Sequence, residues 1–191
     1  MKLYRSPGVW EVTMSPTQRD RDPTPWGRLG KTLSGYFAAR ARGLLASDFA
    51  LLDRDAREFG LLEVHGPQGA KLRFTGGLEA EIERVTPTRH RMFFGDAEVL
   101  ISTGAATSPK IRCLGLQYQT TLSLLRNSAE ASPANAQATV RIKGGLTNRC
   151  YEVFFETDKS SPLPIALFLL YHIVTLRREA YRAATGFEHQ V

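Results

Sequence analysis

The chain has 191 residues, of which 42% are hydrophobic and 23% are charged. This balance is that of an ordinary globular domain, so it excludes a wholly disordered chain, and the length suits one domain. The net charge of +6 is uneven, because residues 1–43 carry eight Lys/Arg and three Asp/Glu whereas residues 44–191 carry seventeen and sixteen. A basic N-terminal arm on a nearly neutral body indicates an anionic partner, such as phospholipid or nucleic acid, unless the arm is simply solvated.

The N-terminal arm divides into two parts. Residues 6–25 are rich in Pro, Asp, Arg, Ser and Thr, which predicts a loop. The segment Trp26–Arg42 places its large apolar residues on one helical face, with Arg28, Lys31 and Arg42 roughly opposite. Its three internal glycines each cost about 1 kcal/mol of helix propensity. We therefore expect a marginal amphipathic helix that lies on the body of the protein or on a membrane.

From residue 44 to residue 156 the chain breaks into short apolar runs separated by turns. The run at 78–83 alternates cleanly between apolar residues and glutamates, as a half-buried strand does. A spacing of eight to twelve residues between turns predicts an antiparallel sandwich or barrel of nine to twelve strands, and the lack of strand–helix alternation excludes βαβ folds. The expected strands are 44–52, 59–65, 70–74, 78–83, 91–94, 98–102, 110–113, 116–124, 136–143 and 151–155.

The C-terminal segment is a helix that is apolar on every side. Leu163–Leu176 has Pro164 in its first turn, and arginines follow it. A transmembrane helix needs about twenty apolar residues, whereas this run has fourteen and includes His172 and Thr175. A helix that is apolar all round and does not span a membrane must be buried all round. We therefore expect a mainly β fold, a closed antiparallel barrel of about twelve strands around a central helix at about residues 163–184, rather than a helix inserted in a membrane.

This layout resembles a known family. The matching features are the turn at residues 53–60, the final strand Tyr151–Glu156 and the helix Pro164–Arg178. Together they resemble the tubby C-terminal-like superfamily, which includes the phospholipid scramblases and the plant LURP-one-related proteins. The resemblance covers residues 44–184 and implies a twelve-stranded barrel filled by a hydrophobic C-terminal helix. Tubby proteins bind phosphoinositides, whereas the cysteine-rich and calcium-binding segments of scramblases have no counterpart here, which argues against lipid scrambling.

The isolated polar residues favour structural roles. Cys113 and Cys150 lie in strand-like runs without metal-ligand spacing, which predicts two buried free thiols in a reduced cytoplasm. We expect His172 to be a neutral core imidazole bonded to a barrel strand, or else a polar group that faces a small internal cavity. Arg126-Asn127 and Asn148-Arg149 lie beside strand ends, where they can bind an anion but more often cap turns.

No catalytic constellation stands out. Glu79, Glu81 and Glu83 form a row that fits the solvated face of a strand better than acid–base chemistry, and Asp53-x-Asp55 fits a turn better than a metal site. The glycine-rich segments lack nucleotide-binding spacing, and no nucleophile elbow is present. We therefore expect no catalytic residue, no metal and no cofactor. No apolar run follows the basic start, so no secretory signal is expected either.

Three functions remain as expectations. The first is a non-enzymatic peripheral membrane or phospholipid-responsive barrel, cytoplasmic and able to lie at the membrane, in which Trp26, Arg28, Lys31 and Arg42 contact anionic lipid. The second is a soluble scaffold whose same segment packs on the barrel and whose partner is a protein. The third, an enzyme or small-ligand binder with a pocket at one barrel end, ranks last because no nucleophile–base pair is visible. We expect no transmembrane span and no nucleic acid partner.

Overall fold

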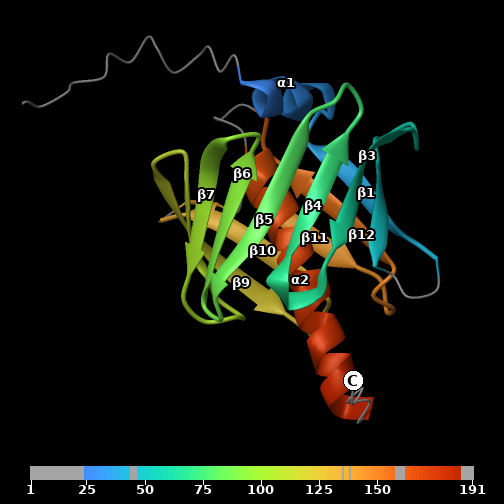
Figure 1. Ribbon diagram of the computed structural model, residues 1–191, viewed down its shortest axis with the longest axis vertical. Helices are drawn as coiled ribbons and strands as arrows, with labels where there is room; N and C mark the ends of the chain where they lie inside the picture. Colours follow the sequence, from blue (N-terminus) through green and yellow to red (C-terminus); the bar gives the residue numbers. More distant parts are fainter. Residues whose placement is uncertain (1–23, 44–46, 135, 138, 158–161, 186–191) are drawn as a thin grey trace, which may run out of the picture.

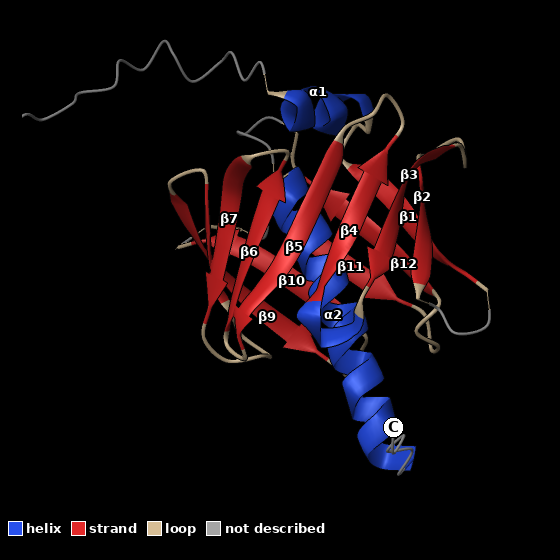
Figure 2. Ribbon diagram, viewed as in Figure 1, coloured by secondary structure: helices blue, strands red, loops and turns tan. Residues whose placement is uncertain are grey.

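Twelve antiparallel strands close into a barrel around one helix (Figures 1 and 2). This computed structural model describes residues 24–43, 47–134, 136–137, 139–157 and 162–185, so the loop predicted for residues 6–25 lies almost wholly outside the described residues. Each strand pairs with its neighbours in sequence, and β1 pairs with β12 to close the ring, with Tyr36 opposite Phe154. The elements are α1 (Pro25–Thr32), β1 (Tyr36–Arg42), β2 (Asp48–Leu52), β3 (Glu58–Val64), η2 (Gly66–Gln68), β4 (Gly69–Phe74), β5 (Glu79–Thr86), β6 (Arg89–Phe94), β7 (Ala97–Thr103), β8 (Lys110–Cys113), β9 (Leu116–Ser123), β10 (Ser128–Pro133), β11 (Val140–Gly144), β12 (Cys150–Phe155) and α2 (Leu163–Thr185).

The predicted closed barrel with a central helix is confirmed. The first thirteen residues of α2, Leu163–Thr175, are all buried, as a helix apolar on every side requires. Most strands alternate between buried and more exposed residues, although β2 has three consecutive buried residues, and the buried side chains of the wall form one core cluster with the helix. The helix packs most closely against β10, β11 and β12. On β10 the inward residues are Ala129 and Ala131, whose small side chains allow the helix to approach that wall.

The helix expected over Trp26–Arg42 is wrong beyond Thr32. Helix α1 begins after Thr24, whose side chain accepts a hydrogen bond from the Gly27 amide, and it ends at Thr32. Ser34 and Gly35 then take left-handed backbone conformations, and a Cβ on Gly35 would lie 2.4 Å from the Phe155 carbonyl oxygen. The turn they form redirects the chain into β1. Residues 36–42 are therefore a barrel strand, so the expected boundary at residue 43 separates β1 from its partner β2.

Two further strand predictions need correction. β10 occupies a Ser- and Pro-containing stretch that we expected to be loop, and the strand expected from residue 136 begins at Val140. Polar and small residues are tolerated in β10 because both edges of the strand are hydrogen-bonded, one to β9 and the other to β11. No helix among the described residues is long and apolar enough to cross a membrane, in agreement with the expectation.

Candidate functional site

The barrel has two different ends (Figure 1). Helix α1 lies across one end, which we call the α1 end, and α2 enters the barrel there. The last turns of α2 project from the opposite end, which we call the exit end. Two hairpin loops and the projecting part of α2 meet there, residues 124–127, 145–149 and 176–185, and we call these three segments the exit rim.

The four residues predicted to contact lipid do not form one surface. Trp26 is 8% exposed, and its ring centroid lies 5.2 Å from that of Phe94, so it belongs to the core at the α1 end. Arg28 and Lys31 are exposed on α1. Arg42 lies at the far end of β1, about 20 Å along the strand from its start, and it pairs with Glu58. The structure therefore brings together two of the predicted cations and removes the aromatic residue from the surface.

Two leucines of the exit rim are fully open to solvent. Leu125 is 100% exposed and Leu146 is 99% exposed, each in a loop between two barrel strands. A large apolar side chain is rarely presented so completely, and exposed apolar residues that lie together are typical of an interaction surface. Sequence reasoning missed both residues, because a leucine next to a strand is ordinarily assigned to the core.

The two loops are fixed to each other. Asn127, which is 2% exposed and has a φ of 49°, donates a hydrogen bond from Nδ2 to the Gly145 carbonyl at 2.7 Å. The Gly144 amide donates in return to the Asn127 carbonyl at 2.7 Å. A Cβ at Gly144 would lie 2.0 Å from Asn127 Nδ2, so a larger residue there would displace the Asn127 side chain. These contacts hold the backbone beneath Leu125 and Leu146 in one arrangement.

Helix α2 anchors the same loops. Arg177 donates from Nη1 to the Leu124 carbonyl at 2.7 Å and from Nη2 to the Leu146 carbonyl at 3.0 Å. Asn148 donates from Nδ2 to the Val174 carbonyl at 3.1 Å and accepts a hydrogen bond from the Tyr151 hydroxyl. The two asparagine side chains thus have structural roles, although each bonds a neighbouring segment rather than capping its own turn. The exposed leucines are carried by a rigid scaffold rather than by unsupported loops.

The exit rim is basic. Its three segments contain one glutamate, Glu179, and five arginines. None of the five pairs with a carboxylate of the described residues. Tyr181, on the projecting part of α2, is 71% exposed. Three of the arginines are exposed, whereas Arg177 and Arg178 are partly buried. The rim therefore combines apolar tips, an aromatic residue and exposed arginines that form no ion pair with a described carboxylate. The arginines are Arg126, Arg149, Arg177, Arg178 and Arg182.

A buried histidine pair lies inside the exit end. His172 donates from Nε2 to the carbonyl of Ala106, in the β7–β8 connection, at 2.8 Å. Its ring centroid is 5.5 Å from that of His90, on the barrel wall. Burial lowers the pKa of His172, and burial together with the neighbouring His172 lowers the pKa of His90 to about 4. His172 is thus a neutral imidazole, as expected, although its partner is a loop rather than a strand.

This pair does not make an active site. The hydroxyl of Ser102, 3.4 Å from His90 Nδ1, is on a side chain that is 1% exposed, so no substrate reaches it. No group of His, Cys, Asp or Glu among the described residues could hold a metal ion. Cys113 and Cys150 are both free. The expectation of two buried thiols is right for Cys113 and wrong for Cys150, which occupies an outward position of β12.

The predicted acidic residues have structural roles. Glu79, Glu81 and Glu83 alternate on the outer face of β5, as expected of a solvated row. Asp53 accepts hydrogen bonds at Oδ1 from the amides of Asp55 and Arg57, both at 2.9 Å, which is a turn stabilised by its own side chain. Neither set lines a described pocket.

Comparison with known proteins adds a likeness of fold. The structure is similar to the crystal structure of a protein from Arabidopsis thaliana, with a TM-score of 0.51 over 78% of this chain and 93% of that chain. The two sequences are 11% identical, so the likeness concerns the fold alone. No protein-family model matches the chain, and no curated protein matches its sequence.

Proposed function

We propose that this protein is a non-enzymatic barrel that binds peripherally to anionic phospholipid surfaces through its exit rim. The observation that carries the proposal is the pair Leu125 and Leu146, fully exposed on two loops that are fixed to each other, in a rim that also exposes Arg126, Arg149 and Arg182. Membership in the tubby C-terminal-like superfamily is part of the same proposal and is supported by the barrel-and-helix layout.

The energetics of such a contact are favourable. Full burial of a leucine side chain stabilises by about 1.5–3 kcal/mol, and both leucine side chains can enter the acyl boundary without moving the barrel. Each Lys or Arg near an anionic leaflet contributes about 1 kcal/mol. Tyr181 adds an amphipathic ring of the kind that prefers the membrane interface. Because the loops are already held by Arg177 and Asn127, little conformational entropy is lost on binding.

The α1 end is a weaker candidate for the same contact. It presents Arg28 and Lys31, but Trp26, the residue that would anchor it in the interface, packs against Phe94. The adjacent loop at residues 53–57 contains two aspartates and two arginines, and Arg57 lies 3.8 Å from Asp55. An end with balanced charge and a buried anchor gains little from an anionic bilayer.

Co-sedimentation with vesicles tests the proposal. Full-length protein is mixed with phosphatidylcholine vesicles, with and without phosphatidylserine, at low and moderate salt. We expect salt-sensitive binding to the anionic vesicles and a loss of affinity of more than about tenfold in a Leu125→Ser, Leu146→Ser double variant. Deleting residues 1–43 is not a usable test, because it removes strand β1.

A matched control separates the two ends. The double variant Arg28→Gln, Lys31→Gln removes exposed cations from the α1 end and should bind the vesicles like the unmodified protein. If this control loses vesicle binding while the leucine variant keeps it, the assignment to the exit rim is contradicted. If the folded, unmodified protein does not bind anionic vesicles at all, the membrane function is wrong and the exposed leucines point to a protein partner.

A further inference from the structure

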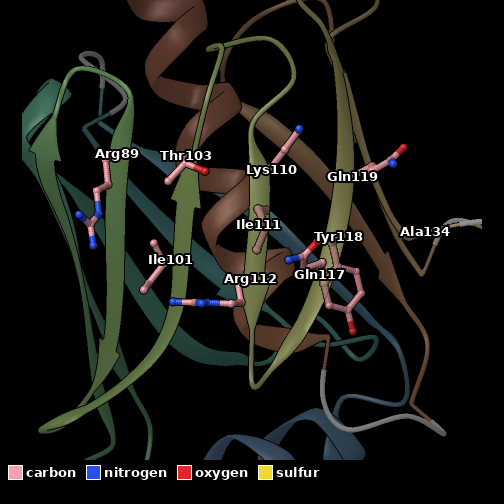
Figure 3. Close-up of a pocket in the computed structure, with 10 residues that line it drawn as sticks. All are labelled: Arg89, Ile101, Thr103, Lys110, Ile111, Arg112, Gln117, Tyr118, Gln119 and Ala134. Carbon is pink, nitrogen blue, oxygen red and sulfur yellow. The ribbon is translucent and has the colours of Figure 1, made fainter.

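A groove on the outer wall of the barrel has no role in the membrane contact described above. It runs over β6, β7, β8 and β9 and has a volume of about 440 Å³ (Figure 3). Three cations line it, Arg89 from β6 and Lys110 and Arg112 from β8. The register places Arg89 and Lys110 on either side of Thr103. The groove is therefore built mainly on four adjacent strands of a rigid sheet.

The three cations that line the groove have no carboxylate partner among the described residues. No carboxylate of the described residues forms an ion pair with Arg89, Lys110 or Arg112. Arg91, two residues from Arg89, does pair with Glu98. Strands β6–β9 hold four Lys or Arg and one glutamate, so the positive charge in excess on this wall is the charge that lines the groove. Such a cluster attracts an anion.

The spacing of the cations selects the kind of anion. Lys110 and Arg112 are alternate residues of one strand, about 7 Å apart, and Arg89 is two strands from Lys110, about 10 Å away. Long side chains could converge on one phosphate from these positions, but Figure 3 shows the Lys110 side chain extending away from that of Arg112. A charge spread in this way suits two phosphate groups on one small molecule better than a single phosphate. The guanidinium groups of Arg89 and Arg112 present forked donors that match phosphate oxygens.

The uncharged lining completes the site. Ile101 is half-buried between the cations, and the Arg112 side chain extends toward it (Figure 3). Gln117, opposite Arg112 in the register, and Gln119 supply amides that can hydrogen-bond hydroxyl groups. An apolar floor and neutral hydrogen-bonding groups between cations suit the carbon skeleton of an organic phosphate better than an inorganic ion.

We propose that this groove binds a small soluble organic molecule that carries two phosphate groups. The site lies on the side wall, separate from the exit rim, so either proposal can be contradicted while the other stands. We assign a soluble ligand because the cations line a groove rather than a flat basic face.

Isothermal titration calorimetry on the full chain tests the proposal with fructose bisphosphate as the probe. We expect saturable binding that weakens with salt, and binding of orthophosphate and of citrate that is at least tenfold weaker. Arg112→Gln and Lys110→Gln should each weaken the binding of fructose bisphosphate by about tenfold. Both residues are exposed, so the variants should fold normally.

Two controls decide between explanations. Lys71→Gln removes a cation from β4, which lies outside the groove and two strands from β6, and where Lys71 pairs with Glu79; it should leave the binding of the bisphosphate unchanged. An equal loss in this control, or no binding by the unmodified protein, would overturn the proposal, and so would tighter binding of citrate. If Arg112→Gln abolishes vesicle binding while soluble bisphosphate does not bind, the groove recognises a lipid headgroup instead, and the assignment to a soluble ligand is wrong.

Discussion

The two ends of the barrel place large apolar side chains in opposite ways. At the α1 end, Trp26 from a short helix is folded inward against Phe94, and it covers the core where α2 begins. At the exit end, Leu125 and Leu146 point into solvent although the backbone beneath them is tightly bonded. The difference shows that the apolar residues of the α1 end serve closure, whereas those of the exit rim are not needed for closure and are available to a partner.

The reason lies in α2 itself. A barrel needs a cover where its central helix begins, because the helix terminus and the core beside it would otherwise meet water, and α1 provides that cover. At the exit end the helix continues outward, and Arg177 closes the gap by bonding to the carbonyls of Leu124 and Leu146. The exit end is thus sealed by polar contacts, which frees the side chains of the two loops.

The largest effect on stability is expected from truncating Trp26, the buried residue through which α1 covers its end of the barrel. Trp26→Ala removes a buried indole that packs against Phe94, which should lower the free energy of unfolding by about 3 kcal/mol. Urea titration followed by circular dichroism measures the change. Vesicle binding should be unaffected under conditions in which the variant is folded. A stability loss below about 0.5 kcal/mol would mean that α1 does not close the barrel.

Acid should weaken the exit end through its buried histidines. The folded pKa of His90 is about 4, against an ordinary value of 6.5, so the unfolded chain binds a proton between these pH values that the folded chain does not. Stability from this group is therefore present above pH 6.5 and is lost as the pH falls toward 4. Between pH 7 and pH 4.5 the loss should be roughly 2 kcal/mol, measured from urea midpoints at each pH.

The variant His90→Gln isolates that contribution. The group that faces His90 from α2 is His172, whose pKa is also lowered by burial, and Arg84 lies close enough to lower the pKa of both. Surface carboxylates respond to acid equally in the two proteins, so their effect cancels in the comparison. We expect the variant to show a smaller decline with acid than the unmodified protein. Identical declines would indicate that His90 is protonated in the folded chain.

A smaller effect is expected from loosening the exit rim. Arg177→Met keeps much of the aliphatic stem but removes the hydrogen bonds to the carbonyls of Leu124 and Leu146. Charge-assisted bonds of this kind contribute about 1.5–3 kcal/mol each in buried settings and less where water can replace them, so we expect a loss of about 1.5 kcal/mol in unfolding free energy. The exposed Arg182→Met is the control and should change stability by less than about 0.5 kcal/mol. Equal losses would show that the rim is not anchored by Arg177.

Much of the fold follows from the amino-acid pattern. The run Leu163–Leu176 is too short for a membrane and too apolar for a surface, which leaves burial inside a closed sheet, and the structure has that arrangement. The alternation in Tyr151, Val153 and Phe155 likewise predicts their inward orientation on β12. Both patterns are strong because burial on all sides, or on one side, constrains each position.

The missed strands lack such a pattern. In β1 the inward residues Phe37 and Ala39 alternate with Ala38 and Arg40, a composition that suits a helix as well as a strand, and pairing with β2 and β12 decides between them. In β10 the inward alanines are small because α2 passes close to that wall. Neither constraint is local, so neither is visible in a single sequence.

The exit rim could not be predicted for a similar reason. Leu125 and Leu146 are more than twenty residues apart and look like ordinary core leucines. Their exposure depends on two loops meeting beside the end of α2, which the contacts of Arg177 and Asn127 bring about. Burial of Trp26 against Phe94, by contrast, removed the residue that the sequence favoured as a lipid contact.

The most direct test of the central claim places a polarity-sensitive fluorophore at each end. In a Cys150→Ser background, the label is attached to Leu146→Cys on the exit rim or to Lys31→Cys on α1, since the remaining Cys113 is buried. With vesicles that contain phosphatidylserine, the emission from position 146 should shift to shorter wavelength and that from position 31 should stay unchanged. A shift at position 31 without one at position 146 would contradict the assignment of the membrane contact to the exit rim.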